Sequence, residues 1–261
     1  MNKLIVIKGA GDLATGIAHR LFRSGFFVVM TELPKPMVIR RTVAFAEAIF
    51  TGRVTVEEVV AVKSEIADIL QVLEEGNIPV VIDPQGLVVD LLQPIAVVDA
   101  ILAKKNIGTQ ITDASIVIGV GPGFTAGRDV HAVVESKRGH YLGRVITKGQ
   151  AIPNTGVPGD IGGYTIERIL RAPCKGVFKG VSKIGQEVTV GEIVAYVDDQ
   201  PVIASITGVL RGLLHDHLIV EKDMKIGDID PRCIPEHCFS ISDKARAIGG
   251  GVLEAILNLR L

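Results

Sequence analysis

The chain has 261 residues, of which 48% are hydrophobic and 22% charged, and its net charge is −1. This composition allows a sizeable core and excludes wholesale disorder. A near-neutral charge without a long run of Lys or Arg argues against nucleic acid as a partner. The longest uncharged run is shorter and more broken than the ~18 apolar residues that a transmembrane helix needs, and the first apolar stretch is too short for a signal peptide. We therefore expect no membrane partner and a cytoplasmic location.

The first thirty residues predict a strand, a helix and a second strand. The apolar run 3–8 is typical of a buried strand, and residues 13–22 place their apolar side chains on one helical face. Ser24 and Gly25 end that helix, and the run 26–30 is again typical of a buried strand. This order is that of a βαβ unit.

The same alternation continues as far as residue 172. Further strands are expected over 78–82, 95–98 and 115–120, and further helices over 64–75 and 100–105. Strands that alternate with helices indicate a mostly parallel sheet covered on both faces. We therefore predict an α/β, Rossmann-like domain over residues 1–172.

Residues 173–232 have a different texture, with short β-like pieces separated by glycine turns. Residues 183–188 and 224–229 echo each other, which is a weak internal repeat. The pattern resembles a small all-β barrel-sandwich hybrid of the biotinyl or lipoyl type. The expected hairpin tip, residues 205–207, contains no Lys for a prosthetic group, so the module would have a structural or binding role.

Residues 233–261 are predicted to contain a helix that returns to pack on the first domain. Ser242 is suited to cap a helix over 243–258. Three consecutive glycines, 249–251, interrupt its pattern and each weakens a helix relative to Ala. Either the helix breaks there or another segment approaches it closely.

The turn after the first strand matches a dinucleotide-binding pattern, G-x-G-x-x-A. The glycines allow a tight turn and a close approach by a pyrophosphate, and an acid about twenty residues on is placed to bind ribose hydroxyls. Against this interpretation, a carboxylate within the turn would repel a pyrophosphate, and a turn that binds nothing remains the alternative. The candidate cofactor-binding residues here are Gly9, Gly11, Asp12, Ala14 and Glu32.

A second candidate site lies in residues 119–144, which are rich in Gly, Arg and His. Gly121 and Gly123 end a predicted strand, where open α/β sheets place their ligands. Arg138 and Arg144 are suited to hold a phosphate, and His140 to transfer a proton near neutral pH. We take His140 and Arg138 as candidate catalytic residues and the other three as candidate cofactor-binding residues; a solvated charged loop is the alternative.

Two acids follow strands, Asp83 and Asp99. Asp99 is expected to cap a helix, whereas Asp83 is a further candidate for binding a cofactor. Cys233 and Cys238 flank a His in a spacing that fits no common zinc pattern, and we predict no metal site. The odd number of cysteines, three, argues against a disulfide framework.

Six segments together resemble one family, the selenium-dependent molybdenum hydroxylase accessory proteins of the YqeB type. The resemblance spans essentially the whole chain, and its long central motif is specific. One mild departure is Glu135-Ser136-Lys137, where the family tends to have Glu-Thr. The matching segments are GAGDLATG (9–16), VVDAILAKKN (97–106), VIGVGPGFTAGRDVHAVVESKRGHYLGRVI (117–146), NTGVPG (154–159), ERILRAP (167–173) and KIGDIDPR (225–232).

The resemblance implies a part in the maturation of molybdenum hydroxylases that carry a labile selenium. It also implies distant similarity to the XdhC-type proteins, which load sulfurated molybdenum cofactor into xanthine dehydrogenase through a Rossmann-like domain. It implies a pathway more firmly than a reaction, and no catalytic residues are carried over.

We therefore expect a maturation factor that binds a small anionic ligand, a molybdopterin-type cofactor or a nucleotide, at the glycine-rich strand ends. It would deliver or modify that cofactor for a molybdenum hydroxylase apoenzyme. The alternatives are an NAD(P)-dependent oxidoreductase, an enzyme that inserts selenium through Cys174 or Cys233, and a scaffold that only docks the partner. Whether the chain forms a homo-oligomer is left open.

Overall fold

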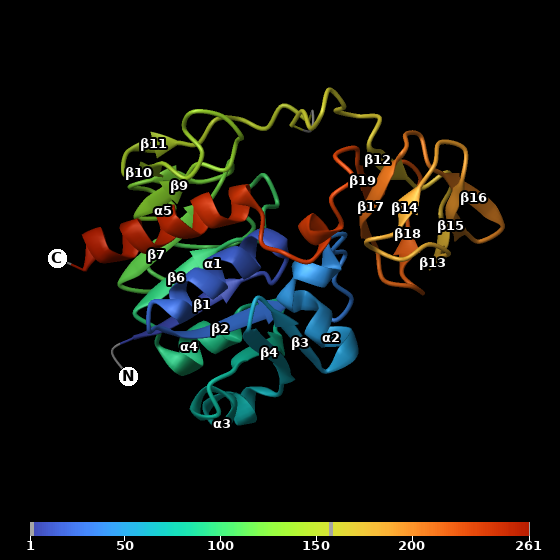
Figure 1. The fold of residues 1–261 in the computed structure, drawn as a ribbon. Helices are drawn as coiled ribbons and strands as arrows, with labels where there is room; N and C mark the ends of the chain where they lie inside the picture. Colours follow the sequence, from blue (N-terminus) through green and yellow to red (C-terminus); the bar gives the residue numbers. More distant parts are fainter. Residues whose placement is uncertain (1–2, 157–158, 261) are drawn as a thin grey trace. The chain divides into compact units, whose positions relative to one another are not determined.

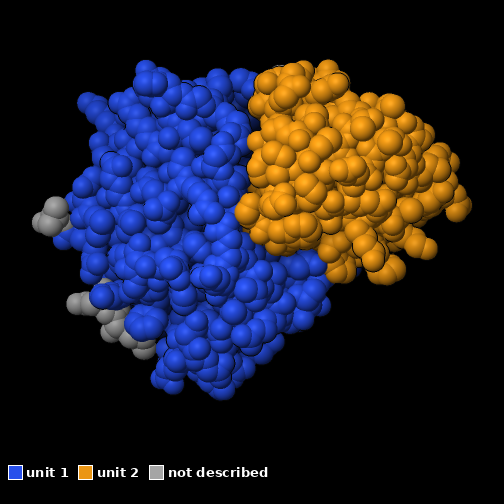
Figure 2. All heavy atoms as spheres, in the orientation of Figure 1, with its two compact units in different colours: residues 1–36, 44–155, 241–261 blue, residues 37–43, 156–240 orange. Residues whose placement is uncertain are grey.

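The structure is a computed structural model and describes residues 3–156 and 159–260. The chain divides into two compact units (Figure 2). Unit 1 comprises Met1–Pro36, Ala44–Thr155 and Ile241–Leu261, and unit 2 comprises Met37–Val43 and Gly156–Ser240. This division begins the β module before residue 173 and assigns to it a short segment, 37–43, that lies far away in the sequence. Two residues of the NTGVPG motif, 157 and 158, lie outside the described residues.

Unit 1 is built on a nine-stranded sheet in the order β10-β9-β7-β6-β1-β2-β5-β4-β3. Only the two edge strands, β3 and β10, pair antiparallel with their neighbours. The strands are β1 (Leu4–Lys8), β2 (Phe27–Glu32), β3 (Arg53–Val56), β4 (Val59–Ser64), β5 (Ile78–Ile82), β6 (Ala96–Asp99), β7 (Ile116–Val120), β9 (Ala132–Val134) and β10 (Val145–Ile146). The short strands β8 (Thr125–Ala126) and β11 (Gly149–Gln150) form a separate pair.

The six central strands have the Rossmann arrangement. Numbered along the chain, β1, β2, β5, β6, β7 and β9 are the first to sixth of these strands, and in the sheet they lie in the order 3-2-1-4-5-6. The predicted Rossmann-like, mostly parallel α/β fold is therefore confirmed.

The two faces of the sheet are covered by different helices (Figure 1). Because side chains alternate along a strand, Leu4 and Val6 face one side of β1, and Ile5 and Ile7 face the other. The first face packs against α3 (Ile69–Glu74) and α4 (Leu87–Leu92) in one apolar cluster. The second is covered by α1 (Asp12–Arg23) and α5 (Asp243–Leu259), which lie side by side.

The C-terminal helix α5 covers a part of the sheet that the connections between the neighbouring strands leave without a helix. The connections 100–115 and 121–131, both fully described, contain no helix, and α5 contacts β7, β9 and β10. The prediction of a helix over 100–105 was wrong. Leu102 and Lys104 adopt left-handed φ values of 61° and 64°, which a helix of L-residues does not accept.

The glycines of α5 mark close approaches and do not break the helix. A Cβ on Gly249 would lie 2.8 Å from the carbonyl oxygen of Gly16 in α1, and one on Gly251 would collide with the carbonyl oxygen of Gly143. A Cβ on Gly250 would meet no atom within 4 Å. Ser242 caps the helix through a hydrogen bond from the amide of Ala245, as its sequence predicted.

Unit 2 contains two four-stranded sheets, in the orders β12-β19-β17-β14 and β16-β15-β13-β18. The two echoing sequence segments overlap β14 and β19, and both strands pair with β17. The predicted small all-β module is confirmed. Its strands are β12 (Ile169–Arg171), β13 (Gly176–Gly180), β14 (Glu187–Val188), β15 (Ile193–Val197), β16 (Gln200–Ile203), β17 (Gly208–Leu213), β18 (Ile219–Val220) and β19 (Lys225–Asp230).

Within the described residues, four short helical turns and one short helix complete the two units. In unit 1 these are η2 (Phe45–Glu47), α2 (Ala48–Thr51) and η3 (Ile66–Asp68). In unit 2, the turns η1 (Arg41–Val43) and η4 (Pro235–Cys238) both pack against β17.

Candidate functional site

The candidate site of unit 1 lies where β1 and β6 end, side by side. The chain leaves β1 toward β2 and leaves β6 toward β7, so the two connections run in opposite directions. Open α/β sheets bind ligands at such a switch point. Gly9 turns the chain there with a φ of +93°, and a Cβ on it would lie 3.2 Å from the carbonyl oxygen of Ala100. Glycine is therefore required by both conformation and packing.

The turn leads directly into the N-terminus of α1. Gly11 is the N-cap residue and has no side chain to accept hydrogen bonds from the first turn of the helix. The following N–H groups carry the partial positive charge of the helix dipole. Asp12, the first helical residue, places a carboxylate beside them, and Ala14 is buried under the turn.

Glu32, at the end of β2, reaches the turn as the sequence predicted. Its Oε2 accepts a hydrogen bond of 2.9 Å from the amide of Ala10, and its Oε1 one of 2.8 Å from the amide of Leu33. Burial raises the pKa of Glu32 above its ordinary value, and the two amide donors oppose that shift. The carboxylate therefore holds the turn in place through its hydrogen bond to the Ala10 amide.

A partly buried polar network joins the ends of β1 and β6. Lys8 Nζ lies 2.8 Å from Asp113 Oδ2 and 3.0 Å from Thr109 Oγ1, and that hydroxyl donates to Asp99 Oδ2 over 2.6 Å. Burial raises the pKa of Asp99, while Thr109, the amide of Ile101 and Lys8 oppose the shift. The expectation that Asp99 caps a helix was wrong, because no helix follows; the carboxylate instead anchors the loop beyond β6.

Asp83 has a local structural role. Its side chain is buried, and its Oδ2 accepts a hydrogen bond of 2.9 Å from the amide of Val88 in the first turn of α4. That contact stabilises the start of the helix, as capping groups do. Asp83 stays a candidate for binding a cofactor through its other carboxylate oxygen.

Gly121 and Gly123 are required by the packing of the chain itself. Their φ values are +76° and +117°, which favour glycine. A Cβ on Gly121 would lie 2.5 Å from Ser136 Oγ, and one on Gly123 2.7 Å from the backbone of Lys105. Protein atoms therefore account for both glycines without a ligand.

The candidate residues beyond β9 have protein partners. Arg138 forms a bidentate pair with Asp243, with distances of 2.6 and 2.8 Å. The guanidinium of Arg144 lies 5.4 Å from the ring centroid of Tyr141, and the His140 ring lies edge-on to the same tyrosine. A joint clamp by the two arginines on one phosphate would therefore require both to exchange partners.

Lys244, which the sequence analysis did not single out, links these residues to the turn. It is half-buried in the first turn of α5. Burial lowers its pKa, the charges of Asp12, Glu135 and Asp243 oppose that shift, and Arg138 adds to it. A cation in the first turn of a helix opposes the helix dipole, and this local conflict is the signal that could have identified it.

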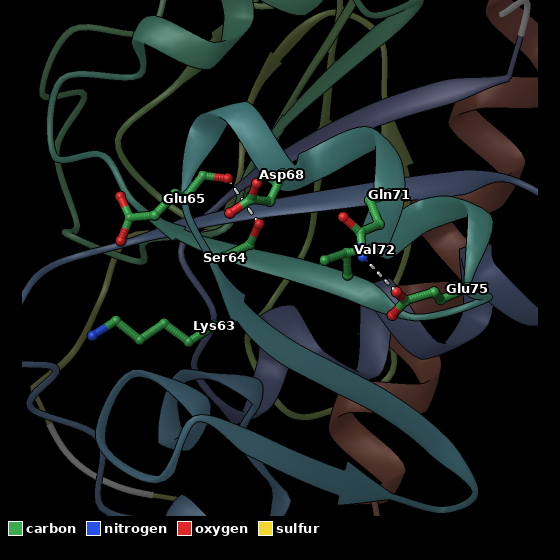
Figure 3. A pocket seen from close by; sticks show the side chains of 7 residues that line it. All are labelled: Lys63, Ser64, Glu65, Asp68, Gln71, Val72 and Glu75. Carbon is green, nitrogen blue, oxygen red and sulfur yellow. Dashed lines mark hydrogen bonds between the residues drawn. The ribbon is translucent and has the colours of Figure 1, made fainter.

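A separate groove lies at the end of β4, beside α3 (Figure 3). Its polar side chains bond within the groove: Ser64 donates to the carbonyl of Glu65, and Gln71 to the carboxylate of Glu75. None of the candidate residues lines it. The lining residues are Lys63, Ser64, Glu65, Asp68, Gln71, Val72 and Glu75.

Within residues 3–156 and 159–260, no group of three or more His, Cys, Asp or Glu side chains is arranged to hold a metal ion. The three cysteines are free thiols: Cys174 is half-buried, Cys233 exposed and Cys238 buried. Among the described helices, none combines the length and apolar character needed to cross a bilayer.

Comparison with curated proteins finds a relative by sequence. No family model matches the chain. "Uncharacterized protein YqeB" of Escherichia coli K12 is 51% identical over 259 residues, which are 99% of this chain and 48% of that protein. The chain therefore spans about half the length of the curated relative it matches.

Solved structures give only distant likenesses. An aspartoacylase family protein of Mesorhizobium loti has a TM-score of 0.26 at 10% identity, and a succinylglutamate desuccinylase of Silicibacter sp. TM1040 has one of 0.25 at 11% identity. Each covers 87% of this chain and 84% of the other. Likenesses this weak carry no argument about function.

Proposed function

From the premise that the chain is a member of the YqeB family, we propose that it is an accessory protein in the maturation of a selenium-dependent molybdenum hydroxylase. It binds a molybdopterin-type cofactor or a nucleotide at the strand ends of unit 1 and delivers or modifies it for the apoenzyme. The resemblance of six sequence segments to such accessory proteins, and through them to XdhC-type proteins, supports the pathway.

One observation supports the site above all others, the contact between Glu32 and the glycine turn. The Glu32 carboxylate accepts a hydrogen bond of 2.9 Å from the Ala10 amide, at the switch point of a sheet with the Rossmann strand order. An acid at the end of the second strand is placed to accept hydrogen bonds from the hydroxyl groups of a bound ribose. The same turn leads to a helix N-terminus without a side-chain cap, which favours an anionic group.

Lys244 reduces the repulsion that Asp12 would exert on a bound anion. The two side chains interact electrostatically, so the ammonium offsets the carboxylate at the mouth of the turn. The anionic end of the ligand would lie against the α1 N-terminus and Lys244, and its hydroxyl-bearing part against Glu32. A half-buried ammonium whose charge is disfavoured by burial gains from an added anion.

An NAD-dependent oxidoreductase is the second candidate, and Glu32 is the observation that favours it. A carboxylate at this position suits the free ribose hydroxyls of NAD and repels the additional phosphate of NADP. Selenium insertion through a thiol is a third; the exposed Cys233 suits it better than the half-buried Cys174.

Complementation tests the accessory role. The gene would be deleted in the source organism and replaced by wild type, Gly11→Val or the triple cysteine-to-serine variant, with the hydroxylase protein level measured alongside its activity. We expect the deletion and Gly11→Val to leave hydroxylase protein present but inactive.

Normal hydroxylase activity in the deletion strain would contradict the accessory role. Full activity with a folded Gly11→Val chain would contradict ligand binding at the turn and favour a docking scaffold. Loss of activity in the triple cysteine variant alone would favour selenium transfer through a thiol.

A further inference from the structure

One sheet of unit 2 carries apolar side chains on the side turned away from the core of the unit, called here the outer face. The sheet has the order β16-β15-β13-β18 (Figure 1). Along β13, Phe178 is fully buried, whereas its neighbours on both sides are exposed, so alternation along the strand separates the two faces. The outer face consists of Val177, Lys179, Ile193, Tyr196, Ile203 and Ile219.

The strand register places apolar residues of the outer face in opposed pairs. Val177 of β13 lies opposite Ile219 of β18, and their exposed fractions are 43% and 61%. Ile193 of β15 lies opposite Ile203 of β16, with exposed fractions of 39% and 50%. Directly opposed side chains on one face of a sheet are close enough to interact. Each pair therefore makes a continuous apolar surface.

This pattern differs from that of an antiparallel sheet with one face in water. Such a sheet ordinarily alternates apolar residues on the core side with polar residues on the solvated side. Contiguous exposed apolar surface marks a site of interaction with a partner. The centre of a protein interface is also poor in charged residues and rich in aromatic ones, and Tyr196 lies at the middle of the outer face.

A cation lies between the two apolar pairs. Lys179 of β13 is in register with Tyr196 of β15, in the row between those pairs. Lys179 is exposed, and none of the described residues forms an ion pair with it. A second copy of this chain, docked through the same face, would bring another Lys179 and no carboxylate. The charge of the outer face therefore favours a different protein, one that supplies an anion.

We propose that the outer face of unit 2 docks a partner protein whose surface presents apolar side chains around a carboxylate, which pairs with Lys179. The identity of that partner rests on the proposed function: it is the molybdenum hydroxylase apoenzyme, because a protein that delivers a cofactor contacts the recipient. Ligand binding and partner docking then use different units of the chain, the strand ends of unit 1 and the outer face of unit 2.

Binding of the purified full chain to purified hydroxylase apoenzyme, measured by calorimetry, tests the proposal. Lys179→Glu sets like charges against each other and should weaken the Kd at least about tenfold. The triple variant Val177→Thr, Ile203→Thr and Ile219→Thr keeps β-branched side chains, which suit strands, but removes apolar surface. It should also weaken the Kd at least about tenfold. Both variants should melt at the wild-type temperature, because the changed side chains are exposed.

A matched control changes exposed apolar side chains in unit 1. Leu70 of α3 and Leu91 of α4 have exposed fractions of 46% and 65%, similar to those of the outer face. The double variant Leu70→Gln and Leu91→Gln should bind the apoenzyme as tightly as wild type. A loss of affinity in this control equal to that of the threonine variant would overturn the assignment to the outer face.

Complementation separates this inference from the proposed function. Normal hydroxylase activity in the deletion strain would contradict the accessory role itself. Where the deletion abolishes activity, the threonine variant should fail to restore it and should still retain the ligand of unit 1 by native mass spectrometry. If it restores activity and both face variants bind the apoenzyme as tightly as wild type, the accessory role stands and the docking face is overturned.

Two further results would overturn the proposal. One is a wild-type chain that does not bind the apoenzyme. The other is a wild-type dimer, measured by light scattering, that the threonine variant converts to a monomer. That result would identify a second copy of the chain as the occupant of the outer face.

Discussion

Two carboxylates of this protein, the half-buried Glu32 in unit 1 and the buried Asp230 in unit 2, have pKa values that are shifted in opposite directions. Glu32 is held by two backbone amides, and burial raises its pKa in spite of them. Burial also acts to raise the pKa of Asp230, but Arg232 and Arg211 lower it below its ordinary value. The difference teaches that burial alone does not decide the charge of an acid; the charge of its partners does.

The same contrast holds for the surroundings of the two acids. In unit 1 the polar groups between β1 and β6 pair in sequence, with Lys8 against Asp113 and Thr109 against Asp99. In unit 2 the carboxylate of Asp230 faces two guanidinium groups, those of Arg232 and Arg211. Glu32 and Asp99 of unit 1 are therefore held mainly by uncharged donors, whereas Asp230 of unit 2 is held by cations.

The largest effect is expected from Asp230→Asn, which removes the buried carboxylate that faces Arg232 and Arg211. Because the buried Arg211 guanidinium loses its ion pair with this carboxylate, the free energy of unfolding should fall by about 3–5 kcal/mol. Urea denaturation measures it, with the exposed Asp199→Asn as a control that should change by less than about 0.5 kcal/mol. Equal effects of the two variants would show that the ion pairs of Asp230 do not stabilise unit 2.

Two glycine variants in α5 test how closely this helix packs in unit 1, and neither variant changes the charge. Gly251→Ala forces a Cβ against the carbonyl of Gly143 and should destabilise unit 1 by about 1–3 kcal/mol. Gly250→Ala enters open space and should stabilise the helix by about 0.5–1 kcal/mol. The same sign for both in urea denaturation would contradict the packing of α5 described here.

The pH dependence of stability should separate the two acids directly. The raised pKa of Glu32 means that its ionised form is disfavoured in the folded state, so wild type should lose stability relative to Glu32→Gln as pH rises above about 4.3. The lowered pKa of Asp230 means the reverse: its contribution is full above about pH 3.9 and is lost as pH falls through the folded pKa. Slopes of the same sign for Glu32→Gln and Asp230→Asn, measured against wild type, would contradict the comparison.

The smallest effect on stability is expected from Arg138→Gln. The pair with Asp243 is exposed, so its loss should cost less than about 1 kcal/mol. If Arg138 instead serves the ligand of unit 1, the variant should keep its melting temperature and bind that ligand more weakly. A large loss of stability would assign Arg138 to the architecture alone.

The sequence predicted the parts of the molecule that depend on neighbours along the chain. The strand, glycine turn and helix of residues 3–22 form one local unit, and Glu32 follows because the second strand returns beside the first. The helix predicted over 100–105 failed because left-handed residues and long-range hydrogen bonds determine that loop. The spacing of apolar residues in the sequence reveals neither the left-handed backbone nor the long-range hydrogen bonds.

The residues that sequence reasoning missed are those whose partners are distant in the chain. Arg211 meets Arg40 across unit 2, Lys8 meets Thr109, and Lys244 reaches Asp12 only because α5 packs beside α1. Each is an ordinary charged residue by its local pattern. The conflict between Lys244 and its helix dipole was the one local sign.

Native mass spectrometry of protein purified anaerobically from the source organism, with Gly11→Val alongside, tests the central claim most directly. We predict that wild type retains a mass that matches a pterin or a nucleotide, and that a folded Gly11→Val chain loses it. An NAD mass would favour the oxidoreductase over the accessory protein. Wild type without a bound mass, or a ligand retained equally by both, would contradict the glycine turn of unit 1 as the ligand site.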